Sequence, residues 1–134
     1  MLERRCVKIL VDTHILLWMP QDSPCLSHEV RNLFANSDTE LYYSSVSISE
    51  ISVKHRVHPE EMPLTGDEVV DLMPNLGCTP LDFKASHAAT MDGLPMHHRD
   101  PFDRMLLAQA KTEGMKLMSH DRQFPQYGDF VIAV

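Results

Sequence analysis

Carboxylates are the side chains in this sequence whose positions could perform chemistry. Asp12 directly follows the apolar run 7–11, where a buried charge without a partner would be costly. Glu50, Asp103 and Asp121 each lie beside another predicted strand or at the start of a helix. Several carboxylates together offer hard oxygen ligands, which suit Mg²⁺ or Mn²⁺. A metal held in this way can activate water for phosphoryl transfer or phosphodiester hydrolysis.

Short β-rich runs alternate with helical runs along the chain, which predicts a parallel sheet with helices on both faces. We expect strands at residues 7–11, 41–46, 78–81, 115–118 and 130–134. We expect helices at residues 13–19, 28–36, 47–57, 66–77 and 83–91, and one from 101 to Gly114. Pro80 cannot donate to a neighbouring strand, so the strand that contains it should lie at a sheet edge.

Capping patterns mark where the helices begin. Ser47-x-x-Glu50 is a capping-box pattern, and it predicts a helix whose first turn contains Glu50. The best-marked helix has Asp100 as its cap, a proline at the first helical position and Asp103 in the first turn. Gly114 is expected just past its end.

The alternation sorts the carboxylates between the two edges of the sheet. Helices beside parallel strands begin at the strands' C-terminal edge, where such folds bind ligands. The acids expected at that edge are Asp12, Glu50, Asp100, Asp103 and Asp121. Asp38, Glu40 and Asp129 precede strands and should lie at the opposite edge, whereas Asp82 follows the outer strand, roughly 10 Å from the first strand. Helix capping is the alternative role for Glu50, Asp100 and Asp103.

The composition is that of one soluble globular domain. The chain has 134 residues, of which 43% are hydrophobic and 23% charged. Lys and Arg number 12 against 19 Asp and Glu, a net charge of −7, which excludes RNA or DNA binding by a simple basic patch. A metal ion held by carboxylates could still bind phosphate groups. The unpaired Cys6, Cys25 and Cys78, with no signal peptide and no membrane-length apolar run, favour a cytoplasmic protein.

Four segments, in this order, resemble the PIN domain and, more narrowly, VapC-type ribonuclease toxins of bacterial toxin–antitoxin modules. They read Val-Asp12-Thr13-His-Ile-Leu-Leu-Trp18, Ser47-x-x-Glu50-Ile-x-x-Lys54, His97-His-Arg-Asp100-Pro-Phe-Asp103-Arg-Met-Leu-Leu-Ala-Gln-Ala and Ser119-x-Asp121. The resemblance covers essentially the whole chain. It implies a PIN-like three-layer α/β sandwich with a parallel five-stranded sheet of order 3-2-1-4-5, forming a single domain over residues 1–134. The first acid lies further along the chain than in the family, so residues 1–6 are interpreted as an N-terminal extension or as the result of a misassigned start.

The resemblance also implies the activity and the residues that perform it. The activity is Mg²⁺- or Mn²⁺-dependent endoribonuclease cleavage by metal-activated water. Asp12, Glu50, Asp103 and Asp121 match the four catalytic acids, and Asp12 and Asp103 match the pair most directly on the metal. Thr13 is expected to support the first acid through its hydroxyl, and Asp100 and Ser119 are expected to support the acids or position the substrate. The implied partners are an RNA substrate, a cognate antitoxin and a second copy of the chain, with DNA reached only through the antitoxin and no membrane contact.

Two arginines and one tryptophan near these motifs have alternative roles. Arg99 and Arg104 flank the acid pair and are candidates to bind RNA phosphates, although solvated charge is the simpler role. Arg104, Ala108 and Lys111 would form the polar stripe of their helix, which leaves Asp103 off the solvent face. Trp18 is expected in the core rather than on a nucleotide-stacking surface.

Two other classes of function remain open from the sequence. One is a receiver or phosphatase-like domain with an acidic Mg²⁺ pocket. A receiver would use Asp82 as phosphoacceptor and leave Asp103 and Glu50 without a role, and a haloacid-dehalogenase-type phosphatase would have an aspartate where His14 stands. The other is a non-catalytic interaction module, which Asn or Ala at position 12 or 103 would have favoured.

Overall fold

The computed structural model describes residues 6–97 and 99–134. Five strands form one parallel sheet of order β3-β2-β1-β4-β5, which confirms the predicted fold and the edge position of the proline-containing strand. The strands are β1 (Val7–Val11), β2 (Thr39–Ser44), β3 (Cys78–Leu81), β4 (Lys116–Ser119) and β5 (Val131–Ala133). The α-helices are α1 (Thr13–Trp18), α2 (His28–Ala35), α3 (Ser45–Val57), α4 (Gly66–Leu72), α5 (Ala85–Thr90) and α6 (Pro101–Glu113). Short 3₁₀ helices span Pro74–Leu76, Met91–Gly93 and Phe124–Tyr127. The expected N-terminal extension lies, apart from Cys6, outside the described residues.

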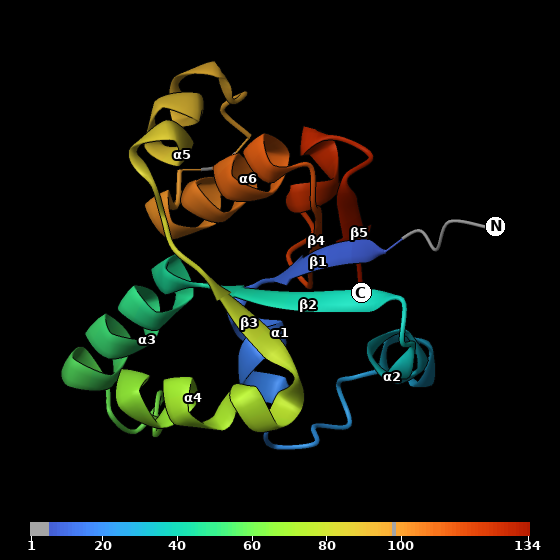
Figure 1. Cartoon of the computed structure of the whole chain (residues 1–134). Coiled ribbons are helices and arrows are strands. Elements are labelled where there is room, and N and C mark those ends of the chain that lie inside the picture. Colours follow the sequence, from blue (N-terminus) through green and yellow to red (C-terminus); the bar gives the residue numbers. More distant parts are fainter. Residues whose placement is uncertain (1–5, 98) are drawn as a thin grey trace, which may run out of the picture.

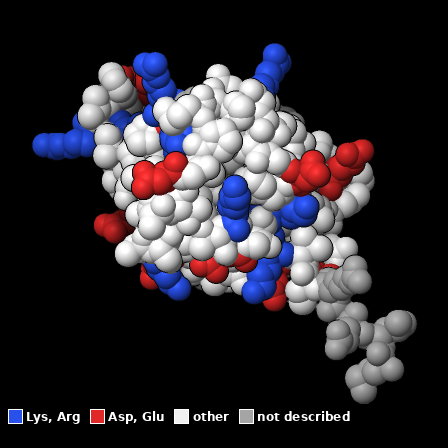
Figure 2. Space-filling view, turned by 90° about the horizontal axis from the view of Figure 1, so that it is seen from above, with Lys and Arg blue, Asp and Glu red and all other residues white. Residues whose placement is uncertain are grey.

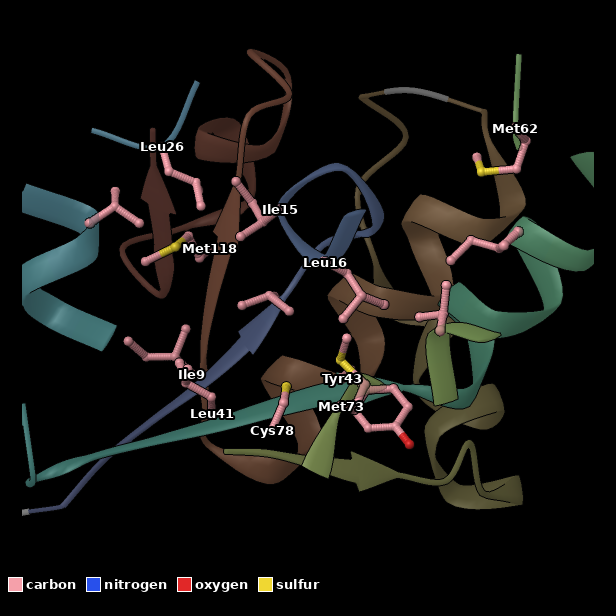
Figure 3. Packing of buried hydrophobic residues seen from close by; sticks show 14 residues of the cluster. Ile9, Ile15, Leu16, Leu26, Leu41, Tyr43, Met62, Met73, Cys78 and Met118 are labelled. Carbon is pink, nitrogen blue, oxygen red and sulfur yellow. The ribbon is translucent and has the colours of Figure 1, made fainter. Parts of the chain in front are cut away.

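The sheet is the middle of three layers. In Figure 1, α5 and α6 lie above the sheet and α1, α2 and α4 lie below it. Successive residues of β1 point to opposite faces, so Ile9 and Val11 join the apolar cluster on the side of α1, whereas Leu10 joins the cluster under α6. Figure 3 shows the first cluster, in which Ile15 and Leu16 of α1 pack against the strands. The last three residues of β1 are therefore buried on both faces of the sheet, as their continuous apolar character requires.

The boundary between β2 and α3 differs from the prediction. The strand begins and ends earlier than expected, and Ser44 caps α3 by accepting a hydrogen bond from the Val46 N–H at 2.9 Å. Ser47, the predicted cap, lies inside the helix and is buried. The prediction was wrong because Ser44 also satisfies the cap preference and its hydroxyl bonds Gln109 of α6. Glu50 therefore lies in the second turn of α3, facing inward.

Other boundaries follow the chemistry of single residues. Asp100 caps α6, and Gly114 follows with a φ of 66°, a conformation that glycine adopts without strain. The helix expected at 66–77 ends at Leu72, because Pro74 has no backbone N–H to continue it, and a 3₁₀ turn fills the remainder. The helix expected at 83–91 begins later, at Ala85.

Arg104 lies on the buried face of α6 rather than on its solvent face, so the predicted polar stripe is wrong. Only 8% of Arg104 is exposed, and Ala108 is fully buried. The guanidinium donates to the carbonyl oxygens of Pro95 at 2.8 Å, Met91 at 3.2 Å and Leu94 at 3.3 Å. Arg104 thereby fixes the segment that carries the chain from α5 back to the start of α6. Because these bonds engage its guanidinium, we do not propose Arg104 as an RNA contact.

Substituting Arg104 with alanine is expected to destabilise the protein by about 2–4 kcal/mol, because three carbonyls lose a charged donor. The loop that carries them also loses its anchor, so Asp103 should be held less firmly. Chemical unfolding of the variant and of Arg99→Ala, whose exposed side chain is the matched control, measures the difference. Equal stability of the two variants would contradict the anchoring role.

Charges of both signs share the surface. Figure 2, which looks down on the side of α5 and α6, shows Lys and Arg interspersed with Asp and Glu rather than gathered into one basic area. This agrees with the composition, which excludes a simple basic patch. Within the described residues, no helix combines the length and the apolar character needed to cross a bilayer.

Candidate functional site

A pocket of about 200 Å³ at the C-terminal edge of the sheet collects the predicted acids. Its acidic lining comes from the N-caps of α1 and α6, from α3 and α6 themselves and from the segment after β4. The full lining is Asp12, Thr13, His14, Glu50, Lys54, Asp100, Asp103 and Asp121. None of Asp38, Glu40, Asp82 or Asp129 contributes to it. The geometric sorting of the carboxylates therefore agrees with the structure, and the receiver alternative loses its phosphoacceptor because Asp82 lies elsewhere.

Asp12 is held rigidly at the end of β1. Its exposed fraction is 3%, and its Oδ1 accepts a hydrogen bond from the Ile15 N–H at 2.9 Å, which caps α1. Its Oδ2 accepts from the Ser119 hydroxyl at 2.7 Å and from the His120 N–H at 3.2 Å. Parallel pairing of β1 with β4 brings these donors to Asp12 from a distant part of the sequence. Ser119, not Thr13, is thus the hydroxyl that supports the first acid.

Glu50 is buried, with 5% of its surface exposed, and it is fully partnered. The Thr13 hydroxyl donates to its Oε1 at 2.7 Å, so the expectation that Thr13 supports Asp12 is corrected to support of Glu50. Ser47 lies 3.0 Å from the Thr13 hydroxyl and continues this chain of hydroxyls. The Lys54 ammonium binds the other carboxylate oxygen of Glu50 at 2.6 Å, one helical turn further along α3.

Asp103 experiences the combined charge of the site. The pKa of its carboxyl is raised to about 7, mainly by burial and in addition by the negative charges of four neighbouring carboxylates. In order of effect these are Asp100, Glu50, Asp121 and Asp12. The site therefore carries more negative charge than Lys54 and the hydrogen-bond donors compensate. A divalent cation is the species that such an excess of carboxylate oxygens binds.

Asp121 is oriented by the turn that follows β4. Its backbone N–H donates to the Ser119 hydroxyl oxygen at 2.9 Å, and its Oδ1 accepts from the Gln123 N–H at 2.8 Å. Ser119 thus links Asp121 to Asp12 through one hydroxyl, which accepts from one side and donates to the other. Asp100 acts mainly as the cap of α6, accepting from the Phe102 N–H at 2.9 Å and the Asp103 N–H at 3.3 Å.

The residues present fit a divalent metal by charge and by ligand type. All five acids offer carboxylate oxygens, and the negative charges of the other four contribute, after burial, to the raised pKa of Asp103. With their present hydrogen bonds, however, these carboxylates do not form a complete coordination sphere. In the part of the chain that the structure describes, no three His, Cys, Asp or Glu side chains are already disposed to hold a metal ion. Asp12, Glu50, Asp103 and Asp121 are the residues that would hold such a metal.

His14 and Lys54 line the pocket but were not identified as site residues from the sequence. The spacing of Glu50 and Lys54, four residues apart on one helix, is the signal that could have predicted their ion pair. His14 directly follows Asp12 and Thr13, and nothing in its sequence context distinguished it. Arg99, the remaining candidate for a phosphate contact, is exposed in the segment before α6.

The fold and the pocket define a class of protein: a three-layer α/β domain with clustered carboxylates where the central parallel strands end. The PIN domain family model matches residues 9–129. The chain belongs to the PIN domain family. Among proteins with curated descriptions, no sequence matches it significantly.

Solved structures share the fold at low sequence identity. VapBC2 from Rickettsia felis, bound to a DNA fragment from its promoter, matches with a TM-score of 0.69 and 14% identity, covering 96% of this chain and 98% of that one. A toxin–antitoxin complex from Klebsiella pneumoniae matches with a TM-score of 0.62 and 15% identity, covering 93% and 96%. VapC20 from Mycobacterium tuberculosis, described as a toxin that cleaves the sarcin–ricin loop, matches with a TM-score of 0.54 and 15% identity, covering 91% and 92%.

Proposed function

We propose that this protein is a Mg²⁺- or Mn²⁺-dependent endoribonuclease and the toxin of a toxin–antitoxin module. The observation that carries the proposal is the group of carboxylates in one pocket, where burial and the neighbouring negative charges raise the pKa of Asp103. Asp12, Glu50, Asp103 and Asp121 are the proposed catalytic acids and metal ligands, with Asp12 and Asp103 most directly on the metal. The similarity in fold to VapC20, a toxin that cleaves RNA, supports this substrate class.

The residues of the chain have distinct tasks in the proposed reaction. When bound, the metal would supply an activated water and neutralise charge on the phosphate oxygens. Asp12 is positioned for metal binding by Ser119 and the N-terminal turn of α1. Thr13 holds Glu50 in a fixed orientation, and Lys54 balances the charge of Glu50. Asp100 fixes the first turn of α6, which sets the direction of Asp103.

An antitoxin and a second copy of the chain are the proposed protein partners, and DNA is reached only through the antitoxin. Several solved relatives are complexes of a toxin with its antitoxin, and one of them is bound to promoter DNA. Apolar side chains at the C-terminal end of α1 and directly after it support a docking role. Leu17 and Met19 are half-buried and pack at the margin of the core. These partners are consistent with a cytoplasmic protein.

RNA cleavage is expected to require a divalent metal. Purified protein should cleave single-stranded RNA with Mg²⁺ or Mn²⁺ and lose this activity in EDTA, since the carboxylates alone provide no nucleophile. Attack by metal-activated water should leave a 5′-phosphate, which end-labelling and mass spectrometry of the fragments would detect. Cleavage that persists in EDTA, or a 2′,3′-cyclic phosphate product, would refute the mechanism.

A further inference from the structure

Three aromatic rings form a continuous row beside the acidic pocket. His14 and Trp18 lie one turn apart on α1, with ring centroids 6.2 Å apart. Trp18 then meets His120, just beyond β4, edge-on at 5.0 Å. His14 itself lines the acidic pocket, and the His120 N–H donates to the Asp12 carboxylate. Both ends of the row therefore contact the acidic site.

The rings of this row are accessible to a ligand. His14 and His120 are exposed, and Trp18 is half-buried, with part of its indole packed at the margin of the apolar cluster. Among the described residues, the Trp18 indole N–H has no hydrogen-bond partner. His120 Nδ1 lies 2.9 Å from the backbone oxygen of Val134, which can only accept, so Nδ1 is the donor of this hydrogen bond. The row thus offers ring surface together with the indole N–H of Trp18 as a hydrogen-bond donor.

The charge of the protein gives it little electrostatic affinity for RNA. Acidic residues outnumber basic ones by 19 to 12, and cations are scattered over the face shown in Figure 2. Without a bound metal, the acidic pocket repels phosphates. Affinity for a single strand must then come largely from contacts that need no cation. Stacking of bases on aromatic side chains is such a contact, and it tolerates any base because every base has a flat face.

We propose that His14, Trp18 and His120 form a stacking surface for unpaired bases of single-stranded RNA on one side of the cleaved phosphodiester. The inference rests on the proposed function, because it places the substrate beside the same acidic pocket. A strand whose cleaved phosphate enters that pocket meets His14 first, and the following bases stack along the row. Trp18, expected from the sequence in the core, is shared between the core margin and this surface.

Trp18 is the single tryptophan of the chain, so its fluorescence reports on this surface directly. The full chain is titrated with a short unpaired RNA in Ca²⁺ instead of Mg²⁺, and the integrity of the RNA is checked on a gel. Saturable quenching is expected with the single strand. A duplex of the same sequence, whose bases are already paired and stacked, should quench much less. Unchanged fluorescence at saturating single-stranded RNA, as judged by anisotropy of a labelled RNA, overturns the proposal.

Substitutions separate stacking from packing. Trp18→Leu keeps an apolar side chain at the core margin and should weaken RNA binding about tenfold, the size of one lost base-stacking contact, whereas Trp18→Phe should retain most of the affinity. His120→Ala should also weaken binding. His120 is exposed, so this substitution should leave the packing of the core unchanged. The readout is the dissociation constant from anisotropy, with a thermal melt to confirm that each variant is folded.

His58→Ala is the matched control. His58 lines a neighbouring pocket of about 310 Å³ that shares His14 with the acidic pocket but lies outside the aromatic row. RNA affinity of this variant should equal that of the wild type. If His58→Ala weakens binding and Trp18→Leu does not, the strand leaves through the neighbouring pocket and the proposal is wrong.

Failure of this proposal can be distinguished from failure of the proposed function. If the wild-type protein neither binds nor cleaves RNA with Mg²⁺, both the nuclease function and the stacking surface are refuted. A wild-type protein that cleaves RNA, while Trp18→Leu and His120→Ala bind RNA as tightly as it does, refutes the stacking surface alone.

Discussion

Asp103→Asn is expected to lower the rate of RNA cleavage by at least roughly 10²–10³-fold while leaving the fold intact. A carboxylate that holds the metal stabilises charge in the transition state, and removal of one such contact has an effect of about this size. Asparagine preserves the shape of the side chain, so helix α6 should form normally. Asp12→Asn should have a similar effect, because Asp12 lines the same pocket. Single-turnover cleavage of a labelled RNA measures both variants.

Asp82→Asn and Asp129→Asn are the matched controls for this experiment. Both residues are exposed, and neither lines the acidic pocket. Their cleavage rates should remain close to that of the wild type. Loss of activity in Asp129→Asn with normal activity in Asp103→Asn would show that the assignment of acids to the two edges of the sheet does not describe the reaction.

Mg²⁺ is expected to raise the unfolding temperature of the wild-type protein. Binding to the native state alone adds about 2.7 kcal/mol of stability at a hundredfold excess over Kd, a shift on the order of 8 °C for a chain of this length. Asp103→Asn should shrink this shift. Without metal, the variant should be as stable as the wild type or more stable, because one repelling charge is gone. Thermal melts of both proteins in EDTA and in Mg²⁺ provide the comparison.

The pH dependence of the metal-free protein tests the same repulsion. The pKa of Asp103 is about 7 in the folded protein against an ordinary value of 3.8. Between these values the native state holds a proton that the unfolded state has lost, so stability falls as pH rises from about 4 to about 7. Asp103→Asn should remove this part of the slope. The shift produced by Mg²⁺ should be larger at pH 8 than at pH 6, since protons compete with the metal.

Simple capping predicts the opposite pattern. If the acids only stabilise helix ends, Mg²⁺ leaves the unfolding temperature unchanged and Asp103→Asn is slightly destabilised by the lost interaction with the helix dipole. This result, at Mg²⁺ concentrations that support any cleavage, would assign the acids a structural role.

The fold could be predicted from the sequence because the sequence signals that specify it act locally. Apolar runs, proline and glycine positions and the cap at Asp100 act within a few residues, and they predicted all five strands and their parallel arrangement. Boundaries were less accurate where two signals competed. Ser44 and Ser47 are both good caps, and the choice between them depends on Gln109, which is 65 residues away from Ser44.

The sequence by itself determined which carboxylates share an edge, since that follows from whether each acid begins a helix or precedes a strand. Only the tertiary structure decided how each acid is held. Ser119 reaches Asp12 across 107 positions, and Thr13 reaches Glu50 across 37. The burial of Arg104 and the raised pKa of Asp103 likewise arise from groups that several elements bring together. Hydrogen bonds and charge interactions depend on distances of a few ångströms in space, and separation along the chain does not specify those distances.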